Sequence, residues 1–232
     1  MWVELQLLWG RCSLLVATQL GPKRGLDCGP RRFSLRATTT MLFTEKLSHE
    51  TKRHLIILTV LFVASAVFGY SAATLHPEEA SKLLDTILRD IKERIGSLDK
   101  VSLFFFIFGT NTAKAFLAMV FGTFFGIVPV LFVMFNGFVL GLVGTLVAFS
   151  EGVRFVTLGI APHGIFEIPG AILASAYGLT LGKAFLQKLR RGRPLTPALL
   201  TALRQFGVVV LPLLAIAAFI EVFVTSAFVR GG

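Results

Sequence analysis

Charged side chains are scarce in this chain of 232 residues, because Asp, Glu, Lys and Arg together make up only 16% of it. Soluble domains contain about 25%. Apolar residues make up 54% of the sequence, and the mean hydropathy is +0.77. The composition therefore predicts a membrane protein.

Cysteine and histidine are also rare. Both cysteines, Cys12 and Cys28, lie in the first forty residues, which excludes thiolate metal sites and disulfides from the rest of the chain. Zinc usually needs three or four protein ligands, and no HExxH pattern occurs. Ser175, within LASAYG, lacks the Gly-x-Ser setting of an intramembrane serine protease. We expect no cofactor and no enzymatic activity.

The sequence contains several long apolar runs. A helix needs roughly 20 apolar residues to cross about 30 Å of hydrocarbon. The block 101–149 would be about 73 Å long as one helix, so it must fold back. Gly122, Gly126 and Pro129 are the expected breakers, and a break at Asn136–Gly137 is the alternative. The prediction is an all-α polytopic membrane protein with a broken apolar segment and about five transmembrane helices, near 55–75, 102–123, 129–149, 163–182 and 206–228.

The net charge of +10 is distributed as in an oriented membrane protein. The 183–204 loop carries six basic and no acidic residues, whereas 77–100 mixes five basic with six acidic ones. The positive-inside rule then places the 183–204 loop and the N-terminus in the cytoplasm. We expect a multi-pass protein of the cell membrane, with the lipid bilayer as its surroundings and no nucleic-acid partner.

An amphipathic helix is predicted over 77–98, after the first span. Pro77 suits a first helical turn, and Glu78 and Glu79 favour the positive end of the helix dipole. Apolar residues recur at helical spacing from Leu84 to Leu98. We expect this helix on the outer side, packed on the protein's own spans or on lipid headgroups, or docking an envelope protein partner.

Residues 1–40 differ from the sequence that follows. They hold six basic and two acidic residues and only a broken apolar run. The segment is either a transit peptide or upstream sequence ahead of a start at Met41. We expect it to be disordered and dispensable, with the membrane domain over 41–232.

Small residues recur every fourth position in the fourth span. Such a stripe lets helix backbones approach closely in lipid. We expect the stripe to pack the bundle internally, with homo-oligomerisation as the alternative. Its members are Gly170, Ala174, Gly178 and Gly182, and the pairs Gly122/Gly126 and Gly137/Gly141 repeat the spacing.

Few polar groups interrupt the spans, and polar groups at that depth are costly and usually functional. His163 and Glu167, in the stretch PHGIFEIPG, are four residues apart and share one helix face. We expect His163 to form a contact with Glu167 or with an asparagine that fixes a kinked turn before the longer span, with proton-coupled transport and metal binding as alternatives. The candidate polar residues are Asn111, Lys114, Asn136, His163, Glu167 and Glu221.

Three segments resemble the stage II sporulation protein M family of integral membrane proteins: 106–116, 136–141 and above all IAPHGIFEIPGAILASAYGLTLG at 160–182. By this resemblance, His163, Gly164 and Glu167 occupy signature positions, and Asn111, Asn136 and Gly137 match further marks. The family often has paired asparagines where this chain has Thr110–Asn111. The resemblance implies a non-enzymatic polytopic membrane component, whose founding member anchors a peptidoglycan-degrading complex in endospore formers.

Two functions follow from these observations. The first is a scaffold or partner of an envelope-remodelling complex, with the helix in 77–100 as its outer contact and the basic 183–204 loop as an inner one. The second is a transporter or permease subunit in which the polar residues of the spans line a path.

Overall fold

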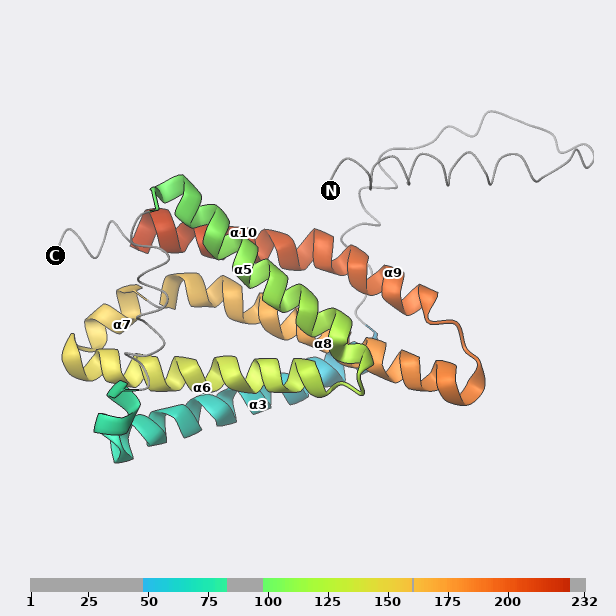
Figure 1. Ribbon diagram of the computed structural model, residues 1–232, viewed down its shortest axis with the longest axis horizontal. Helices are drawn as coiled ribbons and strands as arrows, with labels where there is room; N and C mark the ends of the chain where they lie inside the picture. Colours follow the sequence, from blue (N-terminus) through green and yellow to red (C-terminus); the bar gives the residue numbers. More distant parts are fainter. Residues whose placement is uncertain (1–47, 83–97, 160, 226–232) are drawn as a thin grey trace, which may run out of the picture. The chain divides into compact units, whose positions relative to one another are not determined.

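The computed structural model describes residues 48–82, 98–159 and 161–225, and these ranges contain helices and no strand. The all-α prediction is confirmed. The elements in chain order (Figure 1) are α3 (His49–Leu75), α5 (Lys100–Val120) with the 3-10 turn η1 (Phe121–Thr123), α6 (Ile127–Ser150), α7 (Val153–Gly159), α8 (Ala161–Arg191), α9 (Thr196–Gln205), the π-helical segment η2 (Phe206–Val210), α10 (Leu211–Phe219) and the π-helical segment η3 (Ile220–Thr225).

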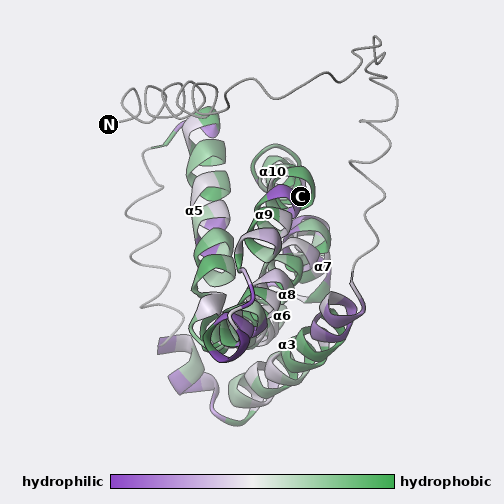
Figure 2. Ribbon diagram, turned by 90° about the vertical axis from the view of Figure 1, so that its right-hand side faces the viewer, coloured by the Kyte–Doolittle hydropathy of each residue, from purple (hydrophilic) through white to green (hydrophobic). Residues whose placement is uncertain are grey.

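Five helical stretches are long and apolar enough to cross a membrane. Figure 2 shows apolar residues along their lengths and polar residues mainly at their ends. This is the number of spans that the sequence predicts. The stretches are 49–75, 100–123, 127–150, 161–191 and 196–225.

The long apolar block breaks between η1 and α6. Phe125 and Gly126 both have positive φ angles, of 56° and 75°, and they reverse the chain. The N–H of Gly126 donates to the carbonyl of Gly122 at 2.8 Å, so the turn satisfies part of its own backbone. Asn136 and Gly137 lie inside α6. The alternative break at those residues is therefore wrong.

Helix α8 is the central element. It contacts every other element of the described bundle. Half of its most apolar stretch is buried in the protein, against 17–28% in the other four long helices. It runs without interruption from Ala161 to Arg191 with Pro169 inside. The predicted turn at 162–170 is thus part of the long helix itself.

The basic loop predicted at 183–204 is mostly helical. Helix α8 continues to Arg191 and α9 begins at Thr196. Helix α9 leads directly into η2 and α10. Of the predicted amphipathic helix at 77–98, residues 77–82 are helical and 83–97 lie outside the described residues.

The buried and exposed faces of α3 reverse the usual pattern of a soluble helix. Its buried residues are mostly small, including Ser65, Gly69 and Ala73. Large apolar side chains such as Ile56, Val60 and Val67 are 58–66% exposed. Lipid is as apolar as these side chains, so burying them gains little, and close backbone contact stabilises the bundle.

Glycines mark the closest helix contacts. A Cβ atom on Gly122 would overlap the backbone of Gly178, and one on Gly182 would overlap the carbonyl of Gly122. Two stripes identified in the sequence therefore pack against each other, α5–η1 against α8. Gly170 instead faces the side chain of Leu214, and Ala174 is fully buried in the adjoining apolar cluster.

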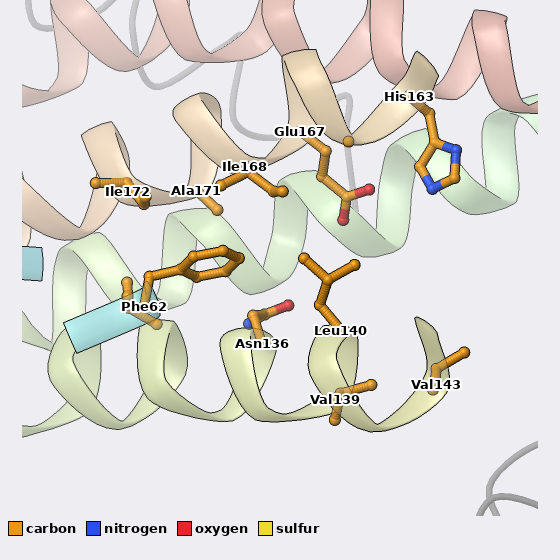
Figure 3. A pocket seen from close by; sticks show the side chains of 12 residues that line it. Phe62, Asn136, Val139, Leu140, Val143, His163, Glu167, Ile168, Ala171 and Ile172 are labelled. Carbon is orange, nitrogen blue, oxygen red and sulfur yellow. The ribbon is translucent and has the colours of Figure 1, made fainter. Parts of the chain in front are cut away.

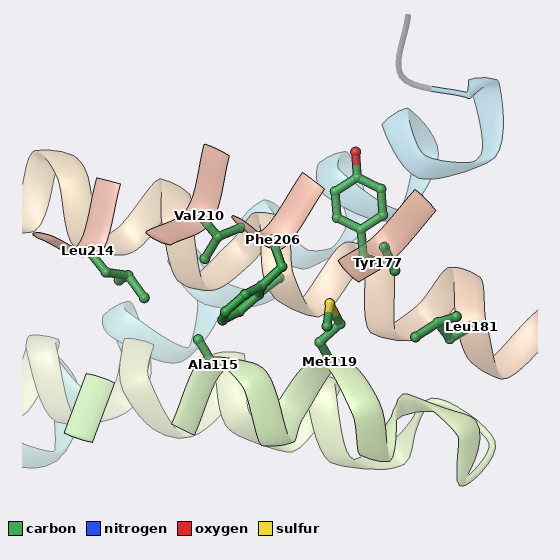
Figure 4. Packing of buried hydrophobic residues seen from close by; sticks show 9 residues of the cluster. Ala115, Met119, Tyr177, Leu181, Phe206, Val210 and Leu214 are labelled. Carbon is green, nitrogen blue, oxygen red and sulfur yellow. The ribbon is translucent and has the colours of Figure 1, made fainter. Parts of the chain in front are cut away.

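That cluster joins α5, α8 and the C-terminal helix. Figure 4 shows Phe206 and Val210 directed toward Ala115 and Met119 of α5. The rings of Phe116 and Phe206 meet edge to face, with centroids 5.3 Å apart. This packing holds the three helices that carry most of the polar residues.

Candidate functional site

Two adjoining cavities gather most of the polar residues predicted from the sequence. The larger cavity, of about 260 Å³, lies between α3, α6 and α8 and is lined by His163, Gly164, Glu167 and Asn136 among apolar neighbours. The smaller, of about 80 Å³, is lined by Asn111, Lys114, Asn136 and Glu167. We call the two together the polar chamber.

Asn136 and Glu167 line both cavities, as does Ala171. In Figure 3, Glu167 and His163 project from α8 toward α6, where Asn136 and Leu140 face them. Polar groups from α5, α6 and α8 thus gather around two cavities that share lining residues. Sequence spacing alone did not predict how these three helices would be combined.

The chamber lies at membrane depth. Asn111 is about 17 Å along α5 from Lys100, and Asn136 is about 14 Å along α6 from Ile127, at 1.5 Å per residue. Both positions are near the middle of a hydrocarbon layer about 30 Å thick. At that depth polar groups are costly unless they face a cavity or one another.

Charges of both signs meet at the chamber. The carboxylate of Glu167 interacts electrostatically with Glu221, His163 and Lys114. Glu221 is half-buried in η3 and does not line either cavity. Glu167 therefore interacts with each of the other three ionisable residues.

The hydrogen bonds of the chamber are incomplete. Nδ2 of Asn136 donates to the carbonyl of Phe132 at 2.7 Å, which fixes its amide. Nδ1 of His163 is buried and has no hydrogen-bond partner within the described protein. Although α8 places His163 and Glu167 one turn apart, no hydrogen bond joins them there. The ring also interacts with the backbone of Gly159, four residues earlier.

The apolar wall of the larger cavity was not predicted. Phe62 of α3 and Leu140 and Val143 of α6 line it opposite α8. Nothing in their sequence context distinguishes these residues from lipid-facing ones. Only the packing of α3 beside α6 brings Phe62 to the cavity.

The chamber's donor set suits protons and hydrogen-bonding groups. No cluster of three or more His, Cys, Asp or Glu residues that could hold a metal ion occurs in the described part of the chain. A carboxylate and an imidazole on one helix face can each accept a proton, and the two amides can hold a polar group beside them.

The fold and the chamber define a polytopic helical membrane protein with polar residues gathered inside its spans. The family model described as Stage II sporulation protein M matches residues 58–226, so the chain belongs to that family. An uncharacterized protein of Methanocaldococcus jannaschii is 30% identical over 175 residues, which cover 73% of this chain and 93% of that protein. No solved structure gives a significant match.

Proposed function

We propose that this protein is a non-enzymatic transporter or permease component of the cell membrane, and that it moves a small polar group through the polar chamber together with a proton. The observation that carries the proposal is the meeting of Asn111, Lys114, Asn136, His163 and Glu167, from three helices, around two adjoining cavities at membrane depth. Ionisable side chains at such depth typically mark ion and proton paths.

Glu167 is the expected proton carrier. It lines both cavities and interacts with His163, Lys114 and Glu221. Because no hydrogen bond joins the two side chains in the described protein, a proton passes from Glu167 to His163 through a bridging water. Nδ1 of that ring has no hydrogen-bond partner within the described protein and can accept the proton. Phe62 and Leu140 line the larger cavity together with this pair.

Proton flux in liposomes tests the proposal. The full chain is reconstituted with a trapped pH-sensitive dye, and a pH gradient is imposed with the membrane potential clamped. We expect the protein to dissipate the gradient faster than empty liposomes do. Glu167→Gln should slow the flux by about tenfold or more, because the amide cannot carry a proton.

Glu151→Gln is the matched control, since Glu151 is exposed at the C-terminal cap of α6 and lies outside the chamber. Its flux should equal that of the wild type. Thermal unfolding of both variants separates loss of transport from loss of fold. Wild-type flux no faster than empty liposomes, or equal losses in the two variants, would contradict the proposal.

A second candidate function is a scaffold or partner of an envelope-remodelling complex. Membership in the stage II sporulation protein M family favours it. The start of the predicted outer helix also has a fixed base, because Ala80 packs against Ala73 of α3 and Leu142 of α6. In this role, the exposed Glu78 and Glu79 beside that base contact the partner.

Charge reversal at the exposed Glu78 and Glu79 tests the scaffold function. Tagged wild-type and Glu78→Lys/Glu79→Lys proteins are purified from crosslinked native membranes. A stoichiometric envelope hydrolase that co-purifies with the wild type should be lost with the variant, while thermal unfolding stays unchanged. An unchanged complex would count against the role of this helix.

A further inference from the structure

An apolar groove of about 580 Å³ lies beside the polar chamber, between α6, α7 and the first turns of α8. Its side chains are apolar except that of Thr157, and the Thr157 hydroxyl already donates to the carbonyl of Val153 at 2.9 Å. The groove thus offers a ligand no free side-chain donor. A water-soluble solute would lose its hydration there without compensation.

The groove adjoins the chamber. Leu140, Gly164 and Ile168 line both the groove and the larger cavity of the chamber. Gly164 has no side chain to divide them, and a Cβ atom there would be only in ordinary contact with Ile168, at 3.6 Å. Close packing therefore does not require a glycine at this position. A glycine does leave the space between the groove and the larger cavity free of a side chain.

A molecule that occupies both spaces must have an apolar part and a polar part. Its apolar part lies between membrane-spanning helices, where hydrocarbon chains are the surrounding solvent. Its polar part meets Glu167 and His163 first. Glu167 carries the one carboxylate among the residues that line the larger cavity, and no lysine or arginine is among them, which favours a positively charged group.

We propose that the chamber receives the amine-bearing headgroup of a membrane lipid, whose hydrocarbon chain lies in the groove between α6, α7 and α8. This inference rests on the proposed transport function and names its substrate class. The ammonium group is held by Glu167. The hydrocarbon chain of the lipid enters the groove sideways from the bilayer. The lipid therefore reaches the chamber without leaving the membrane.

Photocrosslinking with two matched lipids tests the proposal. The full chain is placed in phosphatidylcholine liposomes with either phosphatidylethanolamine or phosphatidylglycerol, each carrying the same diazirine-labelled acyl chain. We expect preferential labelling by the ethanolamine lipid, with adducts on peptides of α6, α7 and α8. Glu167→Gln should reduce that preference by about tenfold, the size expected for one charge-assisted hydrogen bond.

Gly144→Leu fills the groove without touching the chamber, because Gly144 lines the groove and a Cβ atom there meets nothing within 4 Å. Labelling of the α6–α8 peptides should fall to the level without illumination. Gly109→Leu is the matched control: Gly109 is exposed on α5, with equally open space. Its labelling should equal that of the wild type, and thermal unfolding confirms that both variants fold.

Equal labelling by the two lipids, or adducts that persist in Gly144→Leu, would overturn the proposal. The result is independent of the flux assay. Proton flux that depends on Glu167 without lipid labelling would defeat this inference alone. Labelling at the groove without flux would support the lipid site and defeat the transport function.

Discussion

At the scale of single residues, Asp99 determines where α5 begins. Its carboxylate accepts hydrogen bonds from the backbone N–H groups of Val101 at 3.1 Å and Ser102 at 3.4 Å. These N–H groups have no partner within the helix, so the side chain supplies one. Asp99→Ala should lower the melting temperature in detergent, and Asp99→Asn, which retains an acceptor, should lower it less.

The contribution of Asp99 also depends on pH. The Ser102 side chain, then the Ser102 and Val101 N–H groups, hold the pKa of Asp99 below the ordinary aspartate range. A lowered folded-state pKa means that the stabilisation is complete above the ordinary pKa and is lost as pH falls through the lowered one. The difference in melting temperature between wild type and Asp99→Ala should be constant near neutrality and vanish in acid. A difference that instead grows in acid would contradict this assignment.

The members of the polar chamber could be predicted from the sequence, because Asn111, Lys114, Asn136, His163 and Glu167 interrupt apolar runs where polarity is costly. How these residues are arranged in space could not be predicted from the sequence. Spacing places His163 and Glu167 on one face, yet no hydrogen bond joins them, since rotamers and neighbouring helices decide such contacts. Leu140 and Phe62 could not be distinguished from lipid-facing residues without the packing of α3 on α6.

At the scale of helices, three glycines determine how closely α3 and α6 approach. A Cβ atom on Gly69 would overlap the carbonyl of Phe138, and one on Gly141 would overlap the carbonyl of Ala66. Gly137 faces the carbonyl of Phe62 in the same way. Gly141→Ala should therefore lower the free energy of unfolding by about 1 to 3 kcal/mol, the usual range for overpacking.

Gly109→Ala provides the control for this measurement in detergent. A Cβ atom at Gly109 meets nothing within 4 Å. Alanine there should leave the protein as stable as before or stabilise it by up to about 1 kcal/mol, because alanine favours helix more than glycine does. Equal destabilisation by the two substitutions would mean that helix propensity, and not contact between α3 and α6, explains the Gly141 result.

Helix boundaries were predictable where lipid and backbone chemistry set them. Gly126 marks the break because a chain reversal needs positive φ, which glycine adopts readily. The end of α8 was not predictable from apolar length. Its last turns contain Gln187, Lys188 and Arg190, which are good helix formers and continue the helix beyond any apolar span.

At the scale of the whole described bundle, the long helices alternate in direction. Gly137 of α6 faces Phe62 of α3, and Gly141 faces Ala66. Residue numbers rise in the same direction along both helices, so α3 and α6 are parallel. Helix α8 is antiparallel to α3, since Thr180 near its C-terminal half meets His54 near the start of α3 at 3.1 Å. Successive crossings of one bilayer require this alternation.

Alternation predicts that the segment after α6 and the segment after α8 lie on opposite sides of the membrane. Glu151 and Arg193 are exposed in these two segments. With Cys12 and Cys28 replaced by serine, a membrane-impermeant maleimide should label Glu151→Cys in intact cells and label Arg193→Cys only after permeabilisation. This follows from the six basic residues at 183–204, which favour the cytoplasmic side. The cysteine-free chain should remain unlabelled. Labelling of both sites in intact cells would mean that α8 does not cross, and the reverse pattern would mean that the bundle is inserted in the opposite orientation.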